Sequence, residues 1–196
     1  KDSKYLSSEP KNGFRIPFYK NPGKRRFKSS PDAYLIDHFL EEDKVVKNFM
    51  VRNKEYVGRE GISCSSMGVA FTACYLPQNS TFGVNSNIFT KNEEELWFLI
   101  GYLNSSLVTY IVRGMLLRSN MITSGYVSRI PIPTLTKRTK EKIASISKDE
   151  YNSKNEQDNS SIAISKIDKL LFEELDFSND TIKRIVQFCV NVVAST

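Results

Sequence analysis

One stretch, residues 91–135, constrains the fold of this chain more than any other. In its first part, large apolar residues recur every three or four positions, which places them on one face of a helix; they are Leu96, Leu99, Ile100, Leu103, Leu107, Tyr110 and Ile111. Thr90 and Glu93 have the spacing of a capping box, so we expect the helix to begin there. The sequence therefore predicts a buried helical hairpin over residues 92–117.

The segments around this hairpin predict a small sheet. After the hairpin the chain is polar over residues 118–126 and then apolar and rich in proline up to Pro133, which favours a loop and a short strand. Alternating apolar runs separated by turn residues predict further strands before the hairpin. We therefore expect an α+β fold, with a small twisted, mostly antiparallel sheet packed with the helical hairpin, plus C-terminal helices, and with strands from residues 13–19, 55–90 and 122–133.

Helices are also expected before and after this part of the chain. Ser30 followed by Pro31 favours a helix start, and the helical segment it begins would end near Arg52. After residue 136 the sequence predicts a helix, a polar loop over residues 148–161 and two amphipathic helices, the second capped by Ser178. We therefore divide the chain into an α+β domain, residues 1–135, and a helical extension packed on it, residues 136–196.

The positive charge is unevenly distributed. The net charge is +6, and residues 1–59 hold 14 Lys and Arg against 8 Asp and Glu, whereas residues 60–135 and 136–196 are each balanced. A basic excess in one part of a chain fits a polyanionic partner, although a basic run such as residues 24–28 is also common on solvated surfaces.

Several other functions find little support. Three cysteines in apolar settings, with no CxxC, are typical of buried thiols in a reducing cytoplasm; a zinc site from them and His38 is the alternative. No run of about 18 apolar residues predicts a membrane span, and no leader is evident. The sequence contains neither a Gly-rich nucleotide loop nor a hydrolase or metalloprotease motif, so a stand-alone enzyme has no candidate cluster.

The order of motifs resembles a known family. Ser30-Pro31 leads through Leu40 to Arg52; residues 100–107 read IGYLNSSL, close to an LGxLNSxL motif; residues 130–133 read IPIP, close to LPIP. Residues 164–182 resemble the family's closing helix pair. The chain is thus similar to the TaqI-like C-terminal target-recognition (specificity) domain of N6-adenine DNA methyltransferases of restriction–modification and phage-defence systems. Type I specificity subunits have similar hairpins, so the subtype stays open.

The resemblance implies a recognition part that works with a catalytic part outside this chain. The family's S-adenosylmethionine-binding Rossmann-like domain and its (Asn/Asp)-Pro-Pro-(Tyr/Phe) motif do not occur here, since the Asn-Pro of residues 21–22 precedes Gly23 in a turn. We therefore expect no cofactor and no catalysis in this chain, with S-adenosylmethionine in the missing domain. The expected partners are double-stranded DNA and an N-terminal methyltransferase domain or subunit, with no membrane.

Two groups of residues are candidates for DNA contact, because phosphate contacts position a duplex and contacts to base edges specify its sequence. The predicted phosphate-binding residues are Lys20, Lys24, Arg25, Arg26, Lys28 and Arg59. The predicted base-reading residues are Ser63, Ser65, Ser66, Met67, Arg118, Ser119, Asn120, Met121, Thr123, Ser124 and Tyr126. The alternative is a protein-interaction module that uses the exposed faces of the last two helices. For single Ser and Thr residues, local hydrogen bonding is the competing interpretation.

Overall fold

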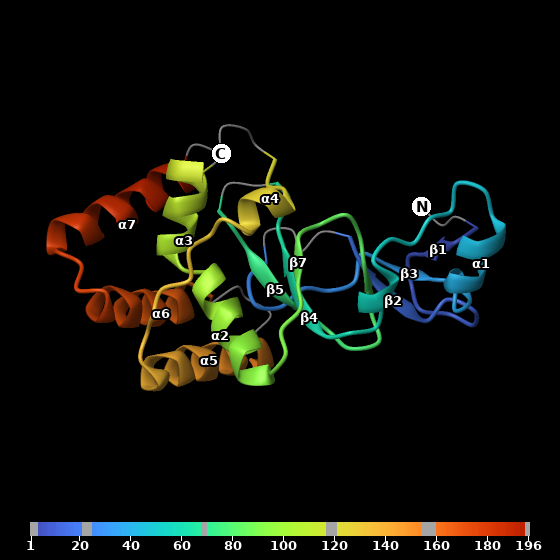
Figure 1. Ribbon diagram of the computed structural model, residues 1–196, viewed down its shortest axis with the longest axis horizontal. Helices are drawn as coiled ribbons and strands as arrows, with labels where there is room; N and C mark the ends of the chain where they lie inside the picture. Colours follow the sequence, from blue (N-terminus) through green and yellow to red (C-terminus); the bar gives the residue numbers. More distant parts are fainter. Residues whose placement is uncertain (1–3, 21–24, 68–69, 117–120, 154–159, 195–196) are drawn as a thin grey trace.

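The computed structural model describes residues 4–20, 25–67, 70–116, 121–153 and 160–194. It is an α+β fold, as the sequence predicts. Figure 1 shows helices at one end, a first sheet at the other end and a second sheet between them. The strands are β1 (Leu6–Ser7), β2 (Ile16–Tyr19), β3 (Ala33–Leu35), β4 (Gly61–Cys64), β5 (Ala73–Leu76), β6 (Thr81–Phe82) and β7 (Asn87–Ile88). The helices are α1 (Phe39–Val45), a 3₁₀ turn (Lys54–Tyr56), α2 (Glu93–Leu103), α3 (Ser106–Tyr110), a π-helical segment (Ile111–Leu116), α4 (Ser124–Val127), α5 (Lys137–Asn152), α6 (Ser160–Glu174) and α7 (Asn179–Ala194).

The strands form two sheets instead of the single sheet that we expected. The first has the order β1-β3-β2-β6 and the second the order β5-β4-β7. Among the named strands of the described residues, all pairs are antiparallel except β2 with β6, which is parallel, so the mostly antiparallel character is confirmed. The connection from β6 to β7 carries the chain from the first sheet to the second.

Two predicted elements are wrong. Residues 33–35 form strand β3 and not a helix, because Ala33 to Leu35 pair with β2 on one side and β1 on the other. These cross-strand bonds override the local helix preference of Ser30-Pro31. The described residues from 121 to 135 contain no strand, and the helix α4 occupies part of this segment.

The helical hairpin is confirmed, but its start differs. Asn92 caps α2, with its side chain accepting a hydrogen bond from Glu95 N at 2.7 Å, while Thr90 lies outside the helix. Asn is as good a cap as Thr and stands next to the first helical residue. Every residue of α2 from Leu96 onward is buried, including Trp97.

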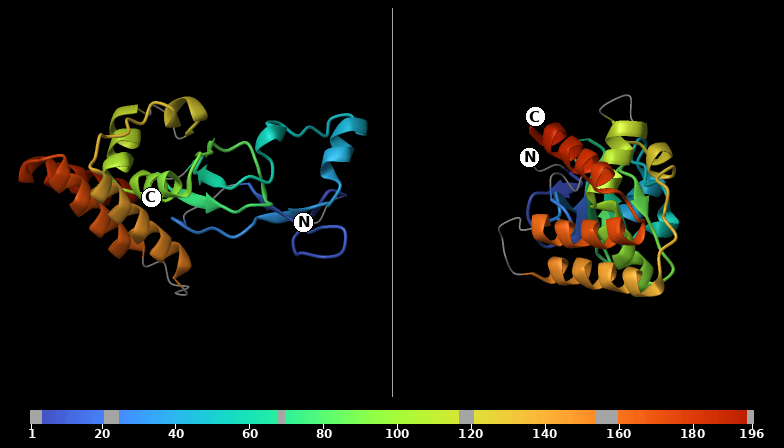
Figure 2. Two further views of the ribbon diagram at one scale, coloured as in Figure 1. Left: turned by 60° about the horizontal axis from the view of Figure 1, so that its bottom comes forward. Right: turned by 90° about the vertical axis from the view of Figure 1, so that its left-hand side faces the viewer.

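The C-terminal helices pack against this hairpin. Figure 2 shows α5 and α6 running side by side, and α5 lies against α2 while α7 lies against α3. At Gly101 the helices approach so closely that an added Cβ would lie 2.3 Å from Ser147 Oγ. The core therefore runs from the second sheet through α2 into α5 and α6 without a break. Of the predicted polar loop over residues 148–161, residues 148–152 belong to α5 and residues 160–161 to α6, while residues 154–159 lie outside the described residues. Ser178 caps α7 as predicted, accepting a hydrogen bond from Thr181 N at 3.2 Å.

A separate, smaller cluster of buried residues lies under the first sheet, around Leu35, Ile36 and Phe39. Within the described residues, no helix alone has the length and apolar character needed to cross a membrane, although Glu93–Leu103 and Ser106–Leu116, bent by 59° at their junction, meet those criteria as a pair.

Candidate nucleic-acid interface

The basic segment between β2 and β3 is fixed to the second sheet by one residue. Phe27 N donates to Ala73 O and Tyr75 N donates to Phe27 O, each at 2.9 Å, so residue 27 forms a parallel bridge beside β5. The Phe27 side chain is completely buried in the main core. The segment that connects two strands of the first sheet is therefore anchored in the second sheet.

Phe27 sits in a tight turn. The φ angle of Phe27 is 62°. Lys28 N donates to Arg26 O at 2.6 Å, and a hydrogen bond between residues i and i+2 defines a γ-turn with Phe27 at its centre. A left-handed backbone at a bulky residue costs on the order of 1–3 kcal/mol, which burial of a phenylalanine, at about 1.5–3 kcal/mol, offsets. The consequence is that Arg26 and Lys28 lie on either side of a fixed hydrophobic anchor.

The predicted phosphate-binding residues differ in their exposure. Lys20, Arg25, Lys28 and Arg59 are exposed, whereas Arg26 is half-buried. Lys24 lies outside the described residues.

Arg26 acts electrostatically on the helical part of the molecule. Burial raises the pKa of Asp168 on α6, while hydrogen bonds from Ser106 and the positive charge of Arg26 act in the opposite direction. The positive charge of Arg26 thus offsets part of the cost of burying this carboxylate, and this electrostatic role competes with phosphate binding.

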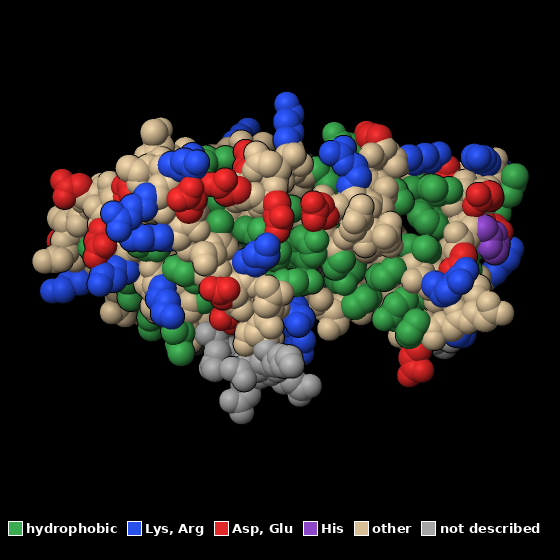
Figure 3. Space-filling view, turned by 90° about the horizontal axis from the view of Figure 1, so that it is seen from below, with side chains coloured by type: hydrophobic (Ala, Val, Ile, Leu, Met, Phe, Trp, Pro, Cys, Tyr) green, Lys and Arg blue, Asp and Glu red, His purple; other side chains and the backbone are tan. Residues whose placement is uncertain are grey.

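Aromatic rings lie under two of the exposed cations. Lys28 Nζ lies 5.6 Å from the centre of the Tyr151 ring, which packs against Tyr75 and Trp97 with ring centres 5.0 and 5.2 Å away. The guanidinium of Arg59 lies 5.3 Å from the Tyr56 ring. A cation over a ring keeps its charge and loses some of its freedom, so it is already ordered for an anionic partner. Figure 3 shows that on the face it draws, cations are interspersed with acidic side chains.

The two predicted base-reading segments lie side by side, although more than 50 residues separate them in the sequence. Ile122 N donates to Ser66 O at 2.8 Å, which ties the segment before α4 to the end of β4. Met67 and Met121 flank this bond, and 58% and 57% of their surfaces are exposed. Thr123 and Ser124 are exposed, and Tyr126 is half-buried. Residues 118–120, the rest of the predicted reading group, lie outside the described residues.

Two predicted base-reading serines do not reach the surface. Ser63 is fully buried and Ser65 is 1% exposed, with Ser65 Oγ accepting a hydrogen bond from Thr72 N at 3.1 Å. Their burial contradicts a role in reading bases, and its physical reason is that β4 is the central strand of its sheet and α2 covers it. Ser66 is half-buried, and its backbone carbonyl accepts the hydrogen bond from Ile122 N that joins the two segments.

Asn104 has a structural role that we did not predict. It is fully buried, its Oδ1 accepts from Ala73 N at 3.0 Å, and its Nδ2 donates to Ala73 O at 2.7 Å and Ile100 O at 2.9 Å. It therefore joins the end of α2 to the same residue of β5 that holds Phe27. One indication of this role was present in the sequence, an asparagine within an apolar helical run, because a buried side-chain amide requires hydrogen-bond partners.

The thiols and the histidine show no catalytic or metal arrangement. Cys64 and Cys74 are buried, and burial raises the pKa of Cys74 to about 12, so both are protonated at neutral pH. The side chain of His38 is 62% exposed, and its Nε2 lies 3.4 Å from Glu42 Oε1. The described part of the chain contains no group of three or more potential metal ligands.

Neither protein-family models nor curated proteins give a match to this sequence.

Proposed function

We propose that this chain is the sequence-specific DNA recognition domain of an adenine-N6 DNA methyltransferase of a restriction–modification or phage-defence system. It would position target DNA for a catalytic domain outside this chain. The observation that carries the proposal is the convergence of residues 66–67 and 121–124, joined by the bond from Ile122 N to Ser66 O. Loops held by a rigid scaffold are the usual place for recognition residues.

The exposed cations would supply the phosphate contacts. Arg25 and Lys28 belong to the segment that Phe27 anchors, so their backbone positions are defined before DNA arrives. Such contacts fix the register of a duplex without reading its sequence. Register matters here because an adenine has to leave the base stack before its amino group is accessible to a methyltransferase.

The converging segments would read bases. The hydroxyls of Thr123 and Ser124 can donate to or accept from base edges, and the exposed Met67 and Met121 offer apolar contact to a thymine methyl group. S-adenosylmethionine would bind in the catalytic domain, in keeping with the absence of a Gly-rich nucleotide loop from this sequence.

The phosphate contacts can be tested by fluorescence anisotropy with a labelled duplex over a range of salt concentrations. The log–log slope of affinity against salt is about 0.9 per phosphate neutralised. Replacing Arg25 and Lys28 with Ala should reduce that slope by between one and two units. The matched control replaces Lys166 and Lys183, two exposed lysines on α6 and α7, and should leave the slope unchanged. Equal slopes for the two variants would refute the role of the anchored segment.

The base contacts require a different measurement. DNA bound from a random pool should yield a consensus sequence with the wild type. Met121→Ala or Thr123→Ala should relax that consensus at individual positions, at about 1–3 kcal/mol of discrimination each, without altering the salt slope. A consensus identical in all variants would assign sequence reading to other residues.

One observation favours a protein-interaction module as a second candidate. On α7, Val186 and Val190 are 43% and 56% exposed and one helical turn apart. Apolar side chains at this spacing suit the docking of another helix. In that case DNA binding would be weak and insensitive to salt, and Val186→Ser with Val190→Ser would abolish association with a methyltransferase partner.

A further inference from the structure

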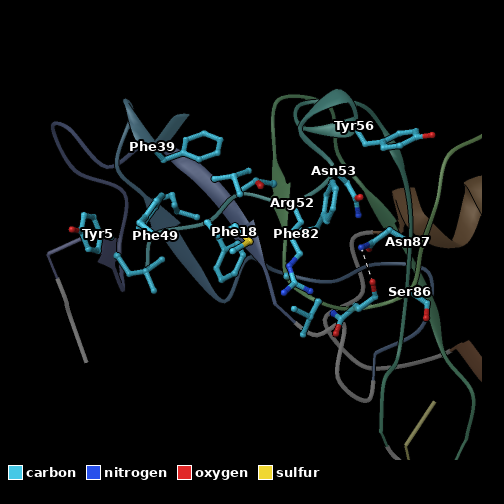
Figure 4. A pocket seen from close by; sticks show the side chains of 18 of the residues that line it. Tyr5, Phe18, Phe39, Phe49, Arg52, Asn53, Tyr56, Phe82, Ser86 and Asn87 are labelled. Carbon is cyan, nitrogen blue, oxygen red and sulfur yellow. Dashed lines mark hydrogen bonds between the residues drawn. The ribbon is translucent and has the colours of Figure 1, made fainter. Parts of the chain in front are cut away.

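Aromatic side chains line a groove between the two sheets, and Ser124 of the converging segments belongs to its lining as well. Its volume is about 1050 Å³, and its walls come from the first sheet, the segment 48–53 and the connection from β6 to β7. Phe18 and Phe49 face it from one side (Figure 4). The Tyr56 and Phe89 rings stack at its edge with centres 4.6 Å apart, and the centre of the Phe82 ring lies 5.5 Å from that of the Phe89 ring. The volume is at the upper end of the range for sites that bind small ligands.

The polar groups of this groove have an unusual composition. Among the described lining residues, Arg52 alone is charged, and four asparagines accompany it. Two buried acceptor atoms, Ser86 Oγ and Asn87 Oδ1, have no hydrogen-bond partner among the described residues, and Ser86 is only 5% exposed. Asn87 Nδ2 donates to Asn85 O at 3.0 Å, which fixes the amide so that its oxygen remains available. Buried acceptors without partners are rare, and a ligand that donates hydrogen bonds would satisfy them.

The backbone holds Arg52 over the groove. We expected Arg52 at the end of a helix, but α1 ends at Val45, and Arg52 lies in an extended segment. Asp43 fastens this segment on both sides of Arg52, since it accepts from Val51 N at 2.5 Å and pairs with Lys54. These contacts hold the pKa of the Asp43 carboxyl below its usual value.

The guanidinium of Arg52 has no carboxylate partner among the described residues. Figure 4 shows it between Phe18 on one side and Asn87 and Ser86 on the other. An exposed arginine without a counter-charge, fixed among aromatic rings, is suited to a phosphate, which it can bind through two parallel hydrogen bonds.

We infer that this groove binds a nucleotide, with the base stacked on the aromatic rings, base N–H groups donating to Asn87 and Ser86, and the phosphate on Arg52. The stacking of bases on aromatic rings is a general mode of binding unpaired nucleotides. The ligand is either a free nucleotide or a nucleotide displaced from a DNA duplex. The inference does not require the duplex contacts of the proposed function, because no residue of the anchored basic segment takes part.

Other ligand classes fit the groove less well. A fatty acyl chain or an apolar peptide would bury the Arg52 charge and leave the acceptors of Ser86 and Asn87 unsatisfied, which is unfavourable. A cation would meet the positive charge of Arg52, and no Asp or Glu belongs to the described lining residues. The planar rings, the amide acceptors and the single cation are satisfied together by a nucleotide.

Binding of dAMP, dGMP, dCMP, dTMP and inorganic phosphate to the whole chain can be followed by ¹H–¹⁵N NMR titration. The shift changes are expected at Ser86, Asn87 and the Arg52 side chain, and phosphate alone should bind more weakly than at least one nucleotide. Arg52→Gln should weaken the affinity by about tenfold or more, because a charge-assisted hydrogen bond is lost. Arg138→Gln, an exposed arginine on α5, is the matched control and should leave it unchanged.

A second variant tests the stacking. Phe82→Leu keeps an apolar side chain and should weaken nucleotide binding by about tenfold while leaving phosphate binding unchanged. In parallel, a duplex with one unpaired bulged nucleotide is compared with the fully paired duplex.

The outcomes separate the two sources of the ligand. Binding of free nucleotides that Arg52→Gln weakens supports a nucleotide site. Binding of the bulged duplex alone, with the same loss in Arg52→Gln, supports a displaced DNA nucleotide. If no probe shifts Ser86 or Asn87 in the wild-type protein, the inference is wrong whether or not the variants fold. Loss of paired-duplex binding in the Arg25 and Lys28 variant with nucleotide binding retained would confirm that the groove binds nucleotides independently of the anchored basic segment.

Discussion

Replacement of Asn104 by Ala should destabilise this protein more than the loss of one polar side chain usually does. Ala73 N–H and C=O point to the same side of β5, away from β4, because both groups of one residue in an antiparallel strand face the same neighbour. On that side the carbonyl has Phe27 N as a second donor, at 2.9 Å, but the N–H depends on Asn104 Oδ1. In the variant, this buried N–H therefore has no acceptor.

The magnitude follows from these contacts. An orphaned buried donor costs about 1–3 kcal/mol, and the two hydrogen bonds donated by Nδ2 contribute about 1 kcal/mol each. We therefore expect Asn104→Ala to lower the free energy of unfolding by about 3–5 kcal/mol, a large share of the about 5–15 kcal/mol typical of a domain. The measurement is urea denaturation followed by circular dichroism and by the fluorescence of Trp97.

The control is Asn152→Ala, at the exposed end of α5, which should change the unfolding free energy by less than about 0.5 kcal/mol. Hydrogen exchange adds a local readout, since the amide of Ala73 should lose protection ahead of the rest of β5. A loss below about 1 kcal/mol with Ala73 still protected would refute the bridging role of Asn104.

Gly101→Ala should destabilise the protein, because the added Cβ would lie 2.3 Å from Ser147 Oγ. The overpacking cost of about 1–3 kcal/mol exceeds the gain in helix propensity of about 1 kcal/mol. Gly125→Ala in α4, where the nearest atom is 3.7 Å away, should be neutral or stabilising in the same denaturation assay; the same sign for both would contradict this packing. Asp168→Asn keeps an acceptor for Ser106 N, which donates to Asp168 at 2.9 Å, and removes a carboxyl whose pKa burial raises. Because the folded protein binds that proton more tightly than the unfolded chain, wild-type stability should fall as pH rises from 3.8 through the raised pKa; the variant should lack this change and be the more stable one at pH 7. Parallel pH profiles would refute the assignment.

The parts of the fold that depend on local sequence period were predictable. The hairpin of α2 and α3 and the helices α6 and α7 follow from apolar residues at intervals of three and four, and the cap at Ser178 follows from residue type alone. A helix closes its hydrogen bonds within its own segment, so the segment carries most of the information needed to predict it.

The strands and the site depended on partners far away in the sequence. Residues 33–35 became a strand because β1 and β2 flank them, and Ser63 became buried because β4 is central; neither neighbour can be deduced from the local sequence. For the candidate interface, the sequence identified the basic segment and the two polar segments. It did not predict that Phe27 anchors the basic segment to β5, or that the bond from Ile122 to Ser66 joins the two polar segments.

The sequence by itself thus determined the helical hairpin and the C-terminal helices, the uneven charge and the residue types available for binding. The tertiary structure decided which of those residues reach the surface and which meet. Arg26 lies close enough to Asp168 to act on it electrostatically, Arg52 lies in an aromatic groove, and Asn104 bridges a helix to a strand. The physical reason is that burial, ion pairing and strand bonding are satisfied between segments, so their outcome depends on the packing of the whole chain.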